Sequence, residues 1–170
     1  DLTRTGHERV LRARLEDALF FFNADRKTRL VDRCEQLSGI IFQNKLGSML
    51  EKSQRIVKLT SILADKLAPE VKEKATRAAK LCKADLLSEM VGEFPSLQGV
   101  MGAAYALHDG ESDTVALAVR EHYMPKRAGA GLPSTVEGAI VGLADRFDTI
   151  AGCFGIGEIP TGTADPFGLR

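Results

Sequence analysis

Two adjacent side chains, His108 and Asp109, carry donor atoms that could hold a metal ion. An imidazole and a carboxylate both bind divalent metals, and a metal held in this way can activate water for hydrolysis of a phosphate ester. That chemistry needs both side chains directed inward from a helix. Gly110 follows the pair at once and is typical of a helix end, so we expect a solvent-facing position. There His108 interacts with the last carbonyls of its helix, which favours a structural role.

A second arrangement combines an alanine-rich segment with a later aspartate. Residues 78–85 (AAKLCKAD) resemble the helix that carries the His-Asp pair in the HD phosphohydrolase superfamily, and residues 143–148 (LADRFD) resemble the helix that supplies its last aspartate. In this alignment Cys82 and Lys83 stand where the His and Asp of that family would be. A lysine ammonium repels a cation and has no lone pair for one. The resemblance therefore implies an HD-like domain without catalytic, cofactor-binding or metal-binding residues.

The carboxylates Asp145 and Asp148 lie three residues apart and could be read as a catalytic pair. Arg146 lies beside them and no histidine is near, so a structural ion pair or a solvated face is favoured. The chain has only three histidines, and its three cysteines are too scattered for a zinc site or a disulfide framework. This cysteine usage is typical of a reducing compartment, and we expect a cytoplasmic protein.

Basic side chains are clustered more than the overall charge suggests. Lys plus Arg number 23 and Asp plus Glu number 23, so the formal net charge of zero gives no sign of nucleic-acid binding. One cluster lies in the helix predicted after Pro69, and another lies in a glycine- and proline-containing loop. Solvated helix faces are usually charged, and contact with RNA phosphates is the functional alternative. The candidate tRNA-binding residues are Lys72, Arg77, Lys80, Lys83, Lys126 and Arg127.

Helical periodicity dominates the elements that must position these side chains. Capping boxes at Ser48 and Ser134, and prolines suited to a first helical turn at Pro69 and Pro95, mark helix starts. Residues 40–42 suit a short strand, but no segment pairs convincingly with them. The predicted helices cover residues 7–23, 48–67, 69–91, 95–109, 112–123 and 134–152.

These elements predict an all-α fold, a single domain of about six or seven helices. The domain is expected over residues 1–152, with a Gly/Pro-rich connector over residues 153–170 toward a following domain. The chain opens with Asp1 instead of Met, so we expect a fragment of a longer protein. No apolar run approaches the roughly 20 residues that a membrane-spanning helix needs, so no membrane association is expected.

Several longer strings resemble the β subunit of the bacterial heterotetrameric glycyl-tRNA synthetase. The most recognisable is residues 90–102 (MVGEFPSLQGVMG), and the other matches are collinear with it. Together they cover nearly the whole chain, which makes chance an unsatisfactory explanation. The other matching strings are residues 8–15, 20–22, 42–47, 82–86, 132–134, 159–162 and 165–167.

This resemblance implies a role in glycyl-tRNA aminoacylation. In that family the α subunit carries the class II core, where ATP, with magnesium, and glycine bind, and the β subunit binds tRNA(Gly). The matching segment is an HD-like domain in the middle of β, before an anticodon-binding region. We therefore expect a segment that supports tRNA positioning, with the α subunit as partner, no cofactor of its own and no catalysis alone. The alternative is an active HD-type metal-dependent phosphohydrolase acting on nucleotides, which a stoichiometric transition metal would favour.

Overall fold

The computed structural model describes residues 2–169; residues 1 and 170, the outer ends of the predicted domain and connector, lie outside the described residues. Within this range the chain is mostly helical, as predicted, and it also contains one small two-stranded sheet. The α-helices are α1 (Leu2–Asp25), α2 (Leu30–Arg33), α3 (Met49–Leu67), α4 (Lys72–Leu81), α5 (Glu89–Glu93), α6 (Val100–His108), α7 (Asp113–Glu121) and α8 (Val136–Gly155). Short 3-10 helices are η1 (Cys34–Gly39), η2 (Pro69–Val71), η3 (Ala84–Leu87) and η4 (Pro95–Leu97).

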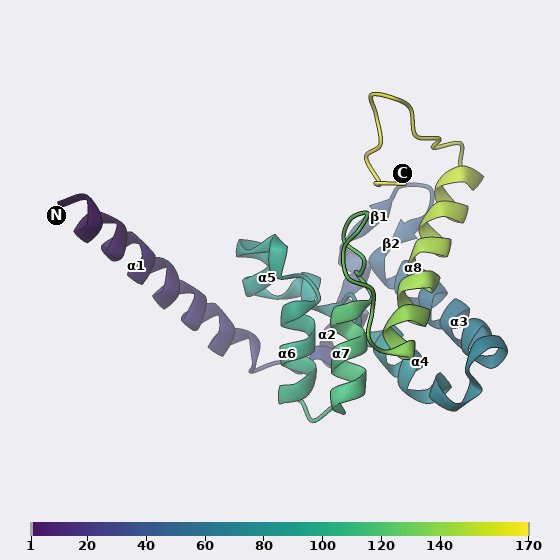
Figure 1. Cartoon of the computed structure of the whole chain (residues 1–170), viewed down its shortest axis with the longest axis horizontal. Coiled ribbons are helices and arrows are strands. Elements are labelled where there is room, and N and C mark those ends of the chain that lie inside the picture. Colours follow the sequence, from purple (N-terminus) through teal and green to yellow (C-terminus); the bar gives the residue numbers. More distant parts are fainter. Residues whose placement is uncertain (1, 170) are drawn as a thin grey trace.

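Helix α1 projects away from the rest of the molecule, which gathers around α3, α4, α6, α7 and α8 (Figure 1). Only the C-terminal part of α1 is packed, where Phe21 and Phe22 meet the core and the Phe22 ring stacks on Tyr105 with centroids 5.8 Å apart. Farther toward the N-terminus, Leu11 and Leu15 are exposed. The helix therefore continues beyond the predicted range of 7–23 without tertiary support over its first turns.

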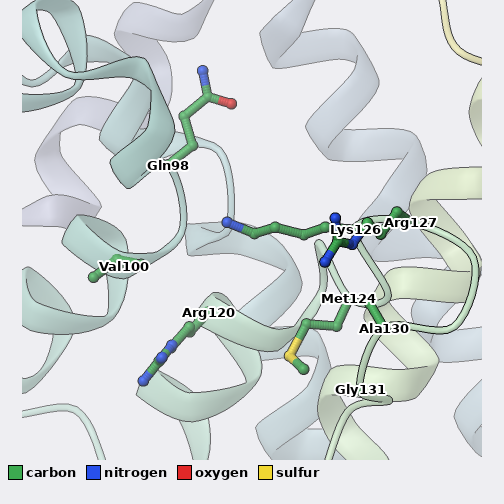
Figure 2. Close-up of a pocket in the computed structure, with 8 residues that line it drawn as sticks. All are labelled: Gln98, Val100, Arg120, Met124, Lys126, Arg127, Ala130 and Gly131. Atoms are coloured by element: carbon green, nitrogen blue, oxygen red, sulfur yellow. The ribbon is translucent and has the colours of Figure 1, made fainter.

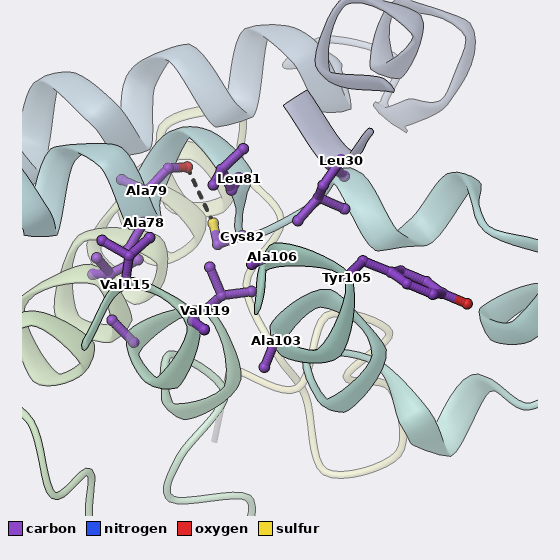
Figure 3. Close-up of a cluster of buried hydrophobic side chains, with 14 of the residues drawn as sticks. Leu30, Ala78, Ala79, Leu81, Cys82, Ala103, Tyr105, Ala106, Val115 and Val119 are labelled. Atoms are coloured by element: carbon purple, nitrogen blue, oxygen red, sulfur yellow. Dashed lines mark hydrogen bonds between the residues drawn. The ribbon is translucent and has the colours of Figure 1, made fainter. Parts of the chain in front are cut away.

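Alanines on α4 form the centre of the core (Figure 3). Ala75, Ala78 and Ala79 are fully buried, and α3, α7 and α8 all pack against this helix. Small side chains let neighbouring helices approach closely, so the packing depends on shape as much as on apolar area. The cluster also takes in Val119 from α7 and Val141 from α8, which joins the four helices into one core.

The start of α3 agrees with its sequence signal. Ser48 Oγ accepts the Glu51 amide at 3.3 Å, and the Glu51 carboxylate accepts the Ser48 amide at 2.7 Å, so the predicted capping box is present. The second predicted box is wrong. Thr135 caps α8 by accepting the Gly138 amide at 3.1 Å, whereas Ser134 donates to a carboxylate on α7.

The single helix predicted over residues 69–91 is wrong. The helix ends at Leu81, η3 follows, and α5 starts after its N-cap Ser88. Asp85 explains the interruption, because its buried Oδ2 accepts the amides of Gly99 at 2.7 Å and Gly102 at 3.1 Å. This long-range contact stabilises the start of α6 and needs a turn that a continuous helix cannot make.

The short strand that residues 40–42 suit is present, but its partner was not predicted, so the all-α prediction missed a hairpin. Strand β1 (Ile41–Gln43) pairs antiparallel with β2 (Gly47–Ser48), with Ile41 opposite Ser48. The Gln43 side chain accepts the Lys45 and Leu46 amides at 2.5 and 3.2 Å, which closes the intervening turn. These local hydrogen bonds hold the turn that brings β1 and β2 together, and the alternation of residues along the sequence did not reveal this turn.

The chain beyond α8 has no further helix or strand among the described residues. The helix itself continues to Gly155, three residues past its predicted end. The segment then folds back toward the hairpin (Figure 1). There the ring centroids of Phe167 and Phe42 lie 6.0 Å apart. No helix within residues 2–169 is both long and apolar enough to cross a membrane.

Candidate functional site

A buried ammonium, that of Lys83, lies where the C-terminal end of α4 meets α7 and α8. Its Nζ is 2.6 Å from Asp145 Oδ2 on α8 and 3.0 Å from His122 Nε2 at the end of α7. The Tyr123 ring centroid lies 4.2 Å from the same nitrogen. Lys83 is only 4% exposed, so its charge is neutralised inside the protein.

The protonation states of this cluster follow from its charges and burial. Burial alone would lower the pKa of Lys83, but the Asp145 carboxylate and smaller contributions from Tyr123 and Cys82 together outweigh burial, and the pKa is raised. Burial would raise the pKa of Asp145, yet Lys83 and Lys52 hold it well below its usual range. Burial and then the Lys83 charge lower the pKa of His122 to about 3. His122 is therefore neutral, with Nδ1 donating to the Val119 carbonyl at 2.6 Å and Nε2 accepting from Lys83.

A second buried lysine, Lys52 of α3, extends the cluster along α8. Its Nζ lies 2.9 Å from Asp145 Oδ1 and 3.1 Å from Asp148 Oδ2, and it donates to Thr149 at 2.6 Å. Arg55 completes the set with two hydrogen bonds to Asp148, at 2.5 and 3.2 Å. Of the two alternatives predicted for the aspartates, the structural ion pair is present and the solvated face is not. The partners are Lys52, Arg55 and Lys83 instead of Arg146, and they join α3, the end of α4 and α8. The fold also brings His122 next to this cluster, although no histidine is near the aspartates in the sequence.

A cation beside Asp145 would be repelled by the ammonium groups of Lys52 and Lys83, which already pair with the two oxygens of that carboxylate. Cys82, the neighbour of Lys83, is fully buried, and burial raises the pKa of its thiol to about 12. A protonated thiol is a poor metal ligand. Among residues 2–169 no group of three His, Cys, Asp or Glu side chains converges with metal-binding geometry.

His108 and Asp109 lie at the C-terminal end of α6, as the sequence indicated, with His108 exposed. The partner predicted for His108 is wrong: its Nδ1 accepts from the Arg26 guanidinium, at 3.1 and 3.3 Å, instead of binding helix carbonyls. Asp109 Oδ2 accepts the Leu30 amide at 2.6 Å, which supports the start of α2. Both side chains therefore have structural contacts.

The candidate cations on α4 differ in their availability. Lys72 is paired with Asp65 at 2.7 Å, and Arg77 forms a two-pronged contact with Glu111. Lys80 is exposed and has no ion pair among the described residues. The prediction that Lys83 contacts RNA is wrong, because the Lys83 side chain is buried. The helix ends two residues before it, so its side chain turns inward instead of following the exposed arc.

Lys126 and Arg127 lie in the loop between α7 and α8, and both are exposed. Arg120, at the last turn of α7, lies beside the same loop (Figure 2). Within the described residues none of these three cations has a carboxylate within ion-pairing distance. They therefore form a locally positive surface on a protein of zero net charge, which we call the loop cations.

The loop that carries them is fixed at both ends. At its start the Arg146 guanidinium donates to the carbonyls of His122, Tyr123, Met124 and Pro125, at 2.9 to 3.4 Å. At its end the Glu121 carboxylate accepts both the amides and the hydroxyls of Ser134 and Thr135, at 2.6 to 2.9 Å. These hydrogen bonds outweigh burial and lower the pKa of Glu121 to about 2. A fixed loop loses less conformational entropy when it binds a partner.

Sequence reasoning missed Lys52 and Arg120. Lys52 had a signal, because it precedes Ile56 by one helical turn and so lies on the apolar face of α3, where a lysine needs a buried carboxylate. Arg120 had none: it is a single basic residue on α7, and only the fold brings it next to the loop.

Comparisons with known proteins give one consistent relationship. Residues 1–170 match the family described as glycyl-tRNA synthetase beta subunit. The chain is 58% identical over 165 residues to the "Glycine--tRNA ligase beta subunit" of Trichlorobacter lovleyi, and 54% identical to the proteins of that name from Syntrophus aciditrophicus and Ralstonia nicotianae. Each alignment covers 97% of this chain and 24% of the relative. The chain thus spans about a quarter of the length of the curated relatives it matches.

Proposed function

Since this chain belongs to the glycyl-tRNA synthetase β-subunit family, we propose that it helps a complete glycine–tRNA ligase to hold tRNA(Gly). The α subunit is the proposed partner, and ATP with magnesium acts there rather than in this segment. The segment supplies phosphate contacts and catalyses nothing alone. Residues 153–170 form the proposed connector to the next domain.

The observation that carries the proposal is the difference between paired and unpaired cations. Lys72, Arg77 and Lys83 each have a carboxylate partner, so RNA would have to compete with an existing ion pair. The loop cations Arg120, Lys126 and Arg127 have no such partner among the described residues and lie together. Binding of a phosphate releases counterions, and this favours contacts from cations that are otherwise only solvated. Lys80 is the additional exposed candidate on α4.

We also propose that the HD-like character of the segment is structural. Lys83 and Lys52 place positive charge beside Asp145, where the aspartate of an active HD site would hold a metal. The ammonium groups provide the charge compensation that a cation would otherwise give, without activating water. The competing function, metal-dependent phosphohydrolysis, lacks a supporting observation in this cluster. A stoichiometric metal that is lost in an Asp145→Asn variant would contradict the proposal.

Salt-dependent binding tests the tRNA role. In the complete enzyme, Lys126→Ala combined with Arg127→Ala should weaken tRNA(Gly) binding and lower the slope of log affinity against log salt by about two, roughly one for each lost phosphate contact. Lys72→Ala combined with Arg77→Ala is the matched control, because it also removes two positive charges but from existing ion pairs. Equal effects of the two double variants would mean that only net charge matters. No effect of the loop variant would refute the proposed function.

A further inference from the structure

A cavity of about 350 Å³ opens beside the loop cations. Its volume lies near the lower end of the range of about 300–1,000 Å³ that small-molecule pockets occupy, so it fits a single small group and not a helical segment. Figure 2 shows Lys126 extending across this space toward the segment that carries Gln98. The lining residues are Gln98, Val100, Arg120, Met124, Lys126, Arg127, Ala130 and Gly131.

The lining combines two kinds of chemistry. The loop cations supply positive charge, and no carboxylate lines the cavity. Apolar surface comes from Val100, Met124 and Ala130. A matching ligand therefore has an anionic part and a flat apolar part. A nucleotide has both, because its phosphate pairs with cations while its base makes apolar contact through either face.

Gln98 lines the side of the cavity that the loop does not form, and Figure 2 shows its amide turned away from Lys126, so it contacts a ligand only after rotation of its side chain. Its amide offers both donors and an acceptor, which suit the edge of a base. Proteins read RNA mainly through unpaired nucleotides whose bases are turned out of the helical stack. The cavity has the charge, the apolar surface and the hydrogen-bonding group for one such nucleotide.

We infer that this cavity receives one unpaired nucleotide of the tRNA, with its phosphate at the loop cations and its base against Met124 and Val100. The inference rests on the proposed function and goes further, since phosphate contacts alone need no cavity. It assigns base recognition to the segment around residues 98–100, at the start of α6. Binding in this cavity would also explain why Arg146 and Glu121 hold the two ends of the loop, because a preformed cavity needs a fixed wall.

The test fills the cavity without changing its charge. In the complete synthetase, Ala130→Phe places a ring in the cavity, and Ala128→Phe adds the same ring to the same loop at an exposed residue that does not line it. Ala130→Phe should weaken tRNA(Gly) binding about tenfold, the loss typical of one stacked base, with the salt slope unchanged. Ala128→Phe should bind like the wild type. Arg120→Ala should weaken binding and lower the slope by about one.

Chemical probing of the bound tRNA identifies the nucleotide. At saturating protein, one unpaired base should be protected from dimethyl sulfate in the wild-type and Ala128→Phe complexes and reactive in the Ala130→Phe complex. Equal unfolding temperatures of the two phenylalanine variants exclude misfolding of the loop as the cause. If Gly131→Ala, which only approaches Met124 at 3.7 Å, weakens binding less than Ala130→Phe, the effect follows the filled volume.

The outcomes separate the two proposals. Normal binding by Ala130→Phe with weakened binding by Arg120→Ala would overturn the cavity inference and leave the phosphate role intact. Normal binding by both variants would overturn both proposals. Weaker association of the subunits in Ala130→Phe, with unchanged tRNA protection, would show that a protein side chain fills the cavity and would also overturn the inference.

Discussion

Replacing Lys83 by methionine removes the buried charge on which the junction of α4, α7 and α8 depends. Methionine keeps the length and apolar stem of the side chain, so the loss is mainly electrostatic. Lys83 Nζ lies 2.6 Å from Asp145 Oδ2 and 3.0 Å from His122 Nε2, and the side chain is almost fully buried. The substitution leaves Asp145 with one ammonium partner instead of two.

The expected loss of stability depends on the partners that Asp145 keeps after the substitution. Breaking a buried ion pair typically costs about 3–5 kcal/mol, because it leaves an uncompensated charge. Asp145 retains Lys52 at 2.9 Å, so we expect the lower end, about 3 kcal/mol. For a chain of this size that loss corresponds to a fall in melting temperature of roughly 10 °C. Urea unfolding followed by circular dichroism at 222 nm measures the change in the free energy of unfolding.

Lys80→Met is the matched control, because it makes the same substitution at an exposed residue near the end of α4. Its effect should stay within about 0.5 kcal/mol. Adding Asp145→Asn to Lys83→Met should cost less than the sum of the single changes, because the carboxylate left by the first change is removed by the second. If Lys83→Met is as stable as Lys80→Met, the buried charges do not hold these helices together.

Three further predictions concern acid stability, packing and the loop. Because the pKa of His122 is about 3 in the folded chain and about 6.5 when unfolded, the unfolded chain binds an extra proton between these values, and stability is lost as pH falls. Between pH 7 and 5 the free energy of unfolding should fall by about 2 kcal/mol, and His122→Gln should remove most of this fall. If His122→Gln loses as much stability over this range as the original chain, His122 is not a buried neutral histidine. Gly102→Ala would place a Cβ 2.9 Å from Val119 Cγ1, so urea unfolding should show a fall of about 1–2 kcal/mol in the free energy of unfolding. Gly92→Ala is the control, because the space around Gly92 is open, and it should be neutral or slightly stabilising. Arg146→Met should speed amide hydrogen exchange in residues 124–131 and weaken tRNA binding in the complete enzyme; unchanged exchange would show that the loop does not depend on this guanidinium.

Local signals in the sequence were sufficient for elements that depend on neighbouring residues. The capping box at Ser48 is one example, since both of its hydrogen bonds join residues three apart. The Gln43 turn is also local, but its three-residue strand is too short to give a periodic pattern. The helix break after Leu81 was not predictable in this way, because it depends on contacts between Asp85 and the start of α6, 14 and 17 residues later.

The same distinction between local and long-range contacts applies to the candidate site. The availability of Lys126 and Arg127 follows from a loop whose glycines and prolines are visible in the sequence. The burial of Lys83 was missed because a continuous helix would have placed it beside exposed Lys80. The contribution of Arg120 depends on the packing of α7 against the loop. Charge clusters in a sequence therefore show where cations lie along the chain, whereas the fold decides which cations are already paired.

The proposed contact between the loop cations and tRNA can be tested in the kinetics of the complete enzyme. A triple variant, Arg120→Ala with Lys126→Ala and Arg127→Ala, should raise the KM for tRNA(Gly) in aminoacylation. Glycine-dependent exchange of pyrophosphate into ATP should stay at the wild-type rate, because that step needs no tRNA contact from this segment. An unchanged KM for tRNA in the correctly assembled variant would show that the loop cations do not help to hold tRNA.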